Sequence, residues 1–112
     1  MLTAINLEET KDFSVKGDDG ENKTVFVIKV LKNSDKYDLF MGCKPESISK
    51  KELIGQLKLG LKEILNVNVG GEVKNITEID DTIFDMFDLN IVLEVIDAIT
   101  NFNLPSETER KN

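Results

Sequence analysis

The chain contains no histidine or tryptophan, and it has one cysteine and two prolines in 112 residues. Without histidine, it lacks the side chain most often used for acid–base catalysis near neutral pH and for binding metal ions. The single cysteine, Cys43, cannot form an intramolecular disulfide, and the usual Cys–His pair that activates a thiol cannot be built. We therefore expect no enzymatic activity, no catalytic residues, and no bound metal or cofactor.

Long hydrophobic stretches and a basic charge are also missing. The longest apolar run, Val25 to Ile28, has four residues, whereas a membrane-spanning helix needs about 20. The first residues do not combine a basic region with an apolar run, as a secretory signal would. Acidic residues outnumber basic ones by 21 to 14, and a net negative charge is unsuited to binding nucleic-acid phosphates. The sequence therefore predicts a cytoplasmic protein that binds neither nucleic acid nor a membrane.

What remains is the composition of an ordinary folded domain. Hydrophobic residues make up 40% of the chain and charged residues 31%, and this length suits a single hydrophobic core. We predict one domain over residues 1–105 and a polar C-terminal tail over residues 106–112. The sequence indicates neither an oligomeric state nor whether residues 1–10 are ordered.

The N-terminal part has the pattern of a β-hairpin. Between residues 11 and 16, Phe13 and Val15 alternate with polar neighbours, which is typical of a half-buried strand. Residues 17–22 are mostly glycine, aspartate and asparagine, which favour turns. Residues 24–31 are apolar on both faces except at Lys29, which predicts an interior strand. We expect these two strands to be joined by a loop of about six residues.

The clearest local signal in the chain is a helix start at Ser49. Ser49 and Glu52 form a capping box, in which the hydroxyl and the carboxylate bind free backbone N–H groups of the first turn. Apolar residues then recur at steps of three and four, which predicts a helix to about residue 65: Leu53, Leu57, Leu61, Ile64 and Leu65. Gly55 and Gly60 weaken this helix, so we expect close packing over them.

Beyond this helix, the sequence predicts a turn and then more helix. Gly70 and Gly71 indicate a small turn or hairpin. A helical region follows Thr77, with a break near Asp88, which is a suitable N-cap for the last helix. That last helix has a broad apolar face and stops near residue 103.

Together these elements predict an α+β fold, with an N-terminal β-hairpin or small antiparallel sheet followed by two or three helices. We expect Phe26 of the hairpin and Ile96 of the last helix to belong to one core. Residues 36–41 fit a strand or a short helix, and their pattern does not decide between the two.

The candidate functional site is an acidic and aromatic segment. On a helix, Asp81, Asp85 and Asp88 lie at positions i, i+4 and i+7 and share one face, with Phe84 and Phe87 at its edge. The spacing of a calcium-binding loop is absent, so we predict no metal here. Apolar side chains flanked by carboxylates suit a protein partner with apolar anchors and basic residues. The alternative is that both phenylalanines are buried in the core and the carboxylates are solvated.

Three stretches of the chain also carry a resemblance to a known family. Residues 9–14 and 24–28 are similar to an N-terminal hairpin in which a short acidic turn precedes a Thr-Val-Phe strand. Residues 60–73 resemble a helix followed by a glycine-containing hairpin, and residues 101–112 resemble a terminal helix with a charged end. In this layout the chain resembles small proteins of tail-assembly-chaperone type, encoded in the structural gene clusters of tailed bacteriophages. It departs from them in its two helical glycines and in lacking an aromatic residue at the glycine hairpin.

The resemblance implies a non-enzymatic assembly factor in the cytoplasm of a bacterial host. Such a factor holds an aggregation-prone virion component, for example the tape-measure protein, until the tail polymerises. Two alternatives stay open: a virion component itself, such as a capsid or tail decoration or connector protein, or a small acidic inhibitor of a host protein. The partner in every case is a protein, and a virion component would remain in purified particles whereas a chaperone would leave.

Overall fold

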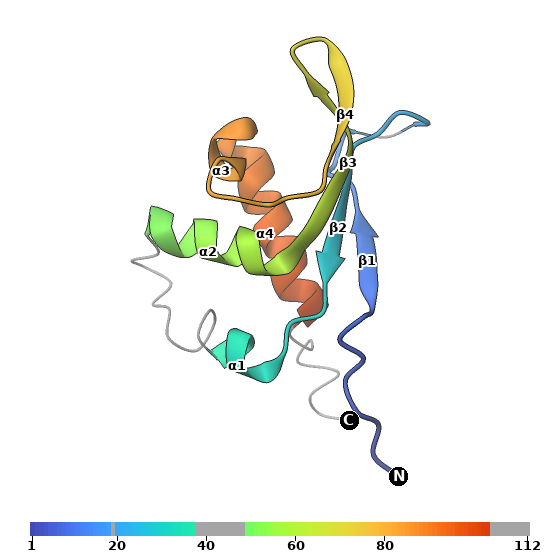
Figure 1. Cartoon of the computed structure of the whole chain (residues 1–112), viewed down its shortest axis with the longest axis vertical. Helices are drawn as coiled ribbons and strands as arrows, with labels where there is room; N and C mark the ends of the chain where they lie inside the picture. The colour runs from blue at the N-terminus through green and yellow to red at the C-terminus, as the bar shows by residue number, and fades with distance from the viewer. Residues whose placement is uncertain (19, 38–48, 104–112) are drawn as a thin grey trace.

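The computed structural model describes residues 1–18, 20–37 and 49–103. Its elements, in chain order, are β1 (Thr10–Phe13), β2 (Val25–Lys29), α1 (Asn33–Lys36), α2 (Lys50–Gly60), β3 (Leu61–Val69), β4 (Glu72–Ile76), α3 (Ile83–Met86) and α4 (Leu89–Asn103). The four strands form one antiparallel sheet in the order β1-β2-β3-β4. The helices α2, α3 and α4 lie on one side of this sheet (Figure 1). The predicted α+β class is confirmed.

Some sequence predictions fall outside the described residues. They concern Cys43, the polar tail 106–112 and the end of the domain at residue 105. The segment 36–41 is described only at its first two residues, Lys36, which ends α1, and Tyr37.

The strands β1 and β2 pair as the predicted antiparallel hairpin. Because β2 lies between β1 and β3, its predicted interior position is also confirmed. The connection covers residues 14–24 and is longer than the loop of about six residues that we predicted. At the ends of this connection, hydrogen bonds from side chains replace the backbone hydrogen bonds between strands. Ser14 Oγ donates to the carbonyl of Thr24, and Asp18 Oδ2 accepts from the Thr24 N–H.

Helix α2 starts where the capping box predicts. Ser49 is its N-cap, and Ser49 Oγ accepts a hydrogen bond from the Glu52 N–H at 3.2 Å. The predicted continuation of the helix to residue 65 is wrong. The helix ends at Gly60, and Leu61 already has extended backbone angles (φ −105°, ψ 133°) and begins β3.

Two β-bulges in β3 explain this error. One lies opposite Val27 and Ile28, where β3 advances by two residues while β2 advances by one. The other lies between Ile64 and Val67, where β3 advances by three residues against two on β4. Each bulge adds one residue to the strand, so the buried positions of β3 are Leu61, Ile64 and Val67. A spacing of three on a strand imitates the i, i+3 spacing of a helix face.

Asn66 makes the second bulge possible. Its φ of 60° is left-handed, a conformation that asparagine adopts more readily than most residues. The Asn66 N–H donates to Asn75 Oδ1 at 3.0 Å, and the Asn66 carbonyl accepts from Thr24 Oγ1 at 2.8 Å. These bonds hold the bulge from β4 on one side and from the start of β2 on the other.

Gly70 and Gly71 join β3 to β4 in the predicted hairpin turn. Their φ angles are 62° and 93°, and a two-residue turn with positive φ at both positions suits glycine because it has no Cβ. Val69 pairs with Glu72 directly across this turn, so the hairpin prediction is confirmed.

The core lies between the helices and the inner face of the sheet, the face toward α4. Its buried members include Phe26, Ile28 and Ile64 from the sheet and Val92, Val95, Ile96 and Ile99 from α4. The expectation that Phe26 and Ile96 share one core is therefore confirmed. The close packing expected over Gly60 is also confirmed, because a Cβ there would lie 2.6 Å from Ile99 Cγ2.

One polar side chain, that of Asn103, is buried where α4 ends. Asn103 Oδ1 accepts from the Leu31 N–H at 2.7 Å, and Nδ2 donates to the carbonyls of Lys29 and Ile99 at 3.1 and 2.9 Å. Because an amide has both a donor and an acceptor, this one side chain satisfies backbone groups of α4, of the last residue of β2 and of the segment that follows it. The sequence predicted the end of the helix here, but not this link.

Replacing Asn103 with leucine should therefore destabilise the fold. The Leu31 N–H would be left buried without a partner, which costs about 1–3 kcal/mol. The matched control is Asn101→Leu, because Asn101 is exposed on the same helix and exposed changes usually stay within about 0.5 kcal/mol. Urea unfolding measures both, and equal midpoints for the two variants would contradict this role of Asn103.

Candidate functional site

The three aspartates of the predicted site do not share a helix face, so that part of the sequence prediction is wrong. The helix α3 covers only Ile83–Met86, so Asp81 lies before it, Asp85 within it and Asp88 after it. The helix ends because Phe87 takes extended backbone angles (φ −128°, ψ 157°).

The two phenylalanines of the predicted site both reach the core. The ring of Phe87 meets Phe26 edge-on, with ring centres 5.4 Å apart. Phe84 is half-buried against the core cluster, with Lys50 Nζ 5.7 Å from its ring centre. Both aromatic side chains therefore stabilise the attachment of α3 to the domain, and contact with a partner stays a prediction for this segment.

The acidic members of the predicted site are exposed, and one of them is paired. Asp81 Oδ1 lies 2.7 Å from Lys58 Nζ of α2, and both side chains face solvent. The hydrogen bond to Asp81 and its charge raise the pKa of Lys58. Asp85 and Asp88 are also exposed, and the Asp88 carbonyl accepts from the N–H groups of Ile91 and Val92 at the start of α4.

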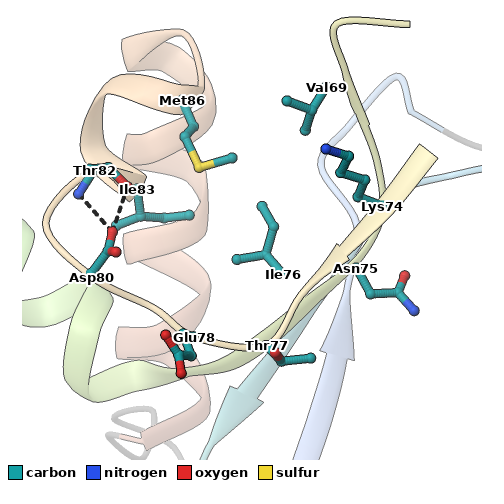
Figure 2. A pocket seen from close by; sticks show the side chains of 10 residues that line it. All are labelled: Val69, Lys74, Asn75, Ile76, Thr77, Glu78, Asp80, Thr82, Ile83 and Met86. Atoms are coloured by element: carbon teal, nitrogen blue, oxygen red, sulfur yellow. Dashed lines mark hydrogen bonds between the residues drawn. The ribbon is translucent and has the colours of Figure 1, made fainter. Parts of the chain in front are cut away.

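A groove lies beside this segment, between β4 and α3 (Figure 2). Its volume is about 420 Å³, and its lining residues are Val69, Lys74, Asn75, Ile76, Thr77, Glu78, Asp80, Thr82, Ile83 and Met86. In Figure 2, the side chains of Met86 and Ile76 point into the space between the helix and the strand. The polar groups Glu78 and Asp80 lie along the connection that joins the two walls.

The groove exists because the β3–β4 hairpin extends past the helices. Figure 1 shows the hairpin projecting beyond the layer formed by α3 and α4. Without a helix over it, the inward-facing Val69 is left 39% exposed, whereas Val67, one inward position earlier, is 4% exposed. Met86 on the opposite wall is 38% exposed. The groove therefore offers apolar surface from both walls.

Asp80 shapes the floor of the groove. One of its carboxylate oxygens, Oδ1, accepts hydrogen bonds from the hydroxyl and the N–H of Thr82, and the Asp80 carbonyl accepts from the Ile83 N–H. The bond from the Thr82 hydroxyl, followed by that from its N–H, lowers the pKa of Asp80. An ionised Asp80 thus fixes the turn that leads into α3.

The net charge of the whole chain comes from the residues after β4. Through Lys74 the sequence has twelve acidic and twelve basic residues, whereas residues 75–103 have seven acidic residues and no basic one. These seven are Glu78, Asp80, Asp81, Asp85, Asp88, Glu94 and Asp97. We call residues 77–103, which contain all seven, the acidic segment; its first part forms one wall and the floor of the groove.

A second concave surface, of about 400 Å³, lies between α2 and the residues before α3. It is lined by Lys50, Lys51, Ile54, Gly55, Lys58 and Asp81. One of its lysines, Lys58, is already paired with Asp81. The positive charge that this surface presents to a ligand is therefore smaller than the count of three lysines suggests.

The described ranges contain no group of three histidine, cysteine, aspartate or glutamate side chains placed to hold a metal ion. Within the same ranges, no helix is long and apolar enough to cross a membrane. Comparisons of the chain with models of protein families, with curated proteins and with solved structures gave no match. Function must therefore be inferred from the geometry and the charge of the chain itself.

Sequence reasoning missed two apolar residues of the groove, Val69 and Ile76. Val69 precedes the glycine turn, and its alternation with the polar Asn66 and Asn68 could have indicated a strand, whereas Ile76 lies five residues beyond the turn. That β4 is an edge strand depends on the sheet order, which no local pattern shows. The charge imbalance was visible in the sequence, since it needs only a count along the chain.

Replacing Thr82 with valine should raise the pKa of Asp80 toward its ordinary value, because the hydroxyl donor is lost. Since folding lowers this pKa, the bond contributes to stability above a pH of about 4 and is lost as the pH falls through the lowered pKa. A carboxyl-carbon NMR titration measures the change. The control is Thr77→Val, whose exposed threonine lies in the same groove without bonding Asp80. Equal Asp80 pKa values in both variants would contradict the role of the Thr82 hydroxyl.

Proposed function

We propose that this chain is a non-enzymatic assembly factor of tail-assembly-chaperone type, which binds a structural protein of a tailed bacteriophage. The observation that supports the proposal is the coincidence of an apolar groove with the acidic segment. Met86 and Val69 expose apolar surface in the groove, and two of the unbalanced carboxylates, Glu78 and Asp80, line it. Apolar anchors with complementary charges around them are the usual composition of a protein-binding surface.

The proposed role needs both parts of this surface. Apolar side chains in the groove shield hydrophobic residues of the partner before the partner assembles. The carboxylates speed the encounter with a basic segment and fix its register. Their charge also keeps the complex soluble, because net charge opposes self-association.

The same surface suggests how the partner is released. A groove of this size holds only a few side chains, so affinity would be moderate and the charged contacts would weaken as salt increases. Polymerisation of the partner can then displace the chain by competing for the same apolar residues. A chaperone of this kind leaves the assembled particle.

An affinity-tagged chain expressed in cells that produce the phage tests the proposal. We expect it to capture a tail or capsid protein and to be absent from purified particles, as measured by mass spectrometry. A fixed number of copies in every particle would contradict the proposal and identify a virion component. Capture of a host protein without any phage structural protein would contradict it and identify an inhibitor.

Charge variants test the contribution of the acidic segment. Asp85→Asn with Asp88→Asn should weaken capture strongly at low salt, and the difference from the parent should shrink as salt increases. Asp12→Asn with Glu21→Gln is the matched control, because it removes the same charge from exposed residues in the neutral part of the chain. Equal loss of capture in both double variants would show that only the net charge matters.

A further inference from the structure

The outer edge of β4 is open to another strand. β4 ends the sheet, and none of the described residues pairs with its outer side. Val69 and Glu72 flank the two-residue turn, and such a flanking pair exchanges hydrogen bonds in a hairpin of this type. By alternation, the N–H and carbonyl of Val73 point away from β3.

This edge has few of the features that usually prevent pairing. Natural edge strands are protected by prolines, bulges or several charged residues. β4 contains no proline, and both bulges of the sheet lie on β3. β4 does carry one such feature, the lysine Lys74 on its groove side, but the charge of Lys74 is offset by Glu72 at 3.6 Å. The side chain of Val73 is 72% exposed.

The groove lies where the side chains of an added strand would point. Successive side chains of a strand alternate between the two faces of the sheet. Lys74 and Ile76 face α3 and line the groove. Every second side chain of a strand beside β4 would point the same way, toward Met86 and Ile83 of the opposite wall.

The charge around the groove selects the chemistry of such a strand. Glu78 and Asp80 line the groove, and the lysine of its lining, Lys74, lies 3.6 Å from the carboxylate of Glu72. A second copy of this chain would bring the same unbalanced carboxylates to the contact. Because only every second side chain of an added strand points into the groove, a segment of another protein fits both the charge and the groove when its groove-facing positions carry apolar and basic side chains in turn.

We propose that the outer edge of β4 binds an extended, basic and apolar segment of the partner protein as a fifth strand, with its apolar side chains in the groove. Backbone hydrogen bonds to Val73 supply affinity that does not depend on sequence. The groove and the carboxylates supply selectivity. This inference rests on the proposed function, since it assigns the way in which the structural protein is held.

A synthetic peptide of the repeat Val-Thr-Lys-Thr is the probe, because it places valine and lysine in turn on the face toward the groove. Added to the ¹⁵N-labelled full chain, it should shift the amide signals of Val73, Asn75 and Met86 and slow hydrogen exchange at Val73. The peptide with glutamate in place of lysine should bind about tenfold more weakly or worse, because like charges oppose binding. Shifts confined to α2, or no binding of the lysine peptide, would overturn the proposal.

Val73→Pro is the decisive variant, because proline removes the outward N–H and blocks a neighbouring strand. Val73→Thr is the control, because it keeps the N–H and a β-branched side chain. We expect Val73→Pro to abolish peptide binding and Val73→Thr to retain it. If the proline variant does not fold, Met86→Lys tests the groove instead, since Met86 lies outside the core cluster. If the variant that folds binds the peptide with the same affinity as the parent, the proposal is overturned.

Two further outcomes separate this inference from the proposed function. If the phage structural protein is captured equally by the parent and by Val73→Pro, the function holds and the strand addition is wrong. If the peptide binds at β4 but the parent captures no structural protein, the strand addition holds and the function is wrong. A parent dimer that Val73→Pro dissociates would assign the edge to a second copy and overturn the proposal.

Discussion

The packing of α4 against the inner face of the sheet is the contact on which the rest of the structure depends. The apolar stripe of α4 covers Phe26 and Ile64, and the fully buried Ile99 fits over Gly60 of α2. The two bulges of β3 make this possible, because they keep Leu61, Ile64 and Val67 on the same face. Asn103 then attaches the end of the helix to the backbone at the end of β2 and just after it.

This arrangement also determines where the domain can bind another protein. The helices cover the sheet over β2 and the first part of β3, and the β3–β4 hairpin continues beyond them (Figure 1). The short α3 is fixed to the core by Phe87 and presents Met86 to the uncovered part of the hairpin. Because the residues directly after β4 form the floor of the groove, the carboxylates of Glu78 and Asp80 lie in it. We propose that this combination serves the handling of a basic, apolar partner.

Local signals predicted those parts of the fold that local interactions determine. The glycine turn at Gly70 and the cap at Ser49 depend on residues close in sequence, and both were found. The strand β3 was mistaken for helix because its bulges arise from pairing with β2 and β4, which a single segment does not reveal. The predicted aspartate face failed for a similar reason, since α3 ends where Phe87 turns toward Phe26. The groove depends on the order of the strands in the sheet, so local sequence patterns could not predict it. The aspartates of the predicted site were correctly expected to be exposed.

The most direct test is site-specific photo-crosslinking in cells that produce the phage. A photoreactive residue in place of Met86 lies in the groove, and one in place of the exposed Asp12 lies on β1, at the opposite edge of the sheet. We predict a crosslink from position 86 to a phage tail or capsid protein, and none from position 12. Crosslinks from position 12 alone, equal crosslinks from both, or none from either would contradict the assignment of the groove as the binding site.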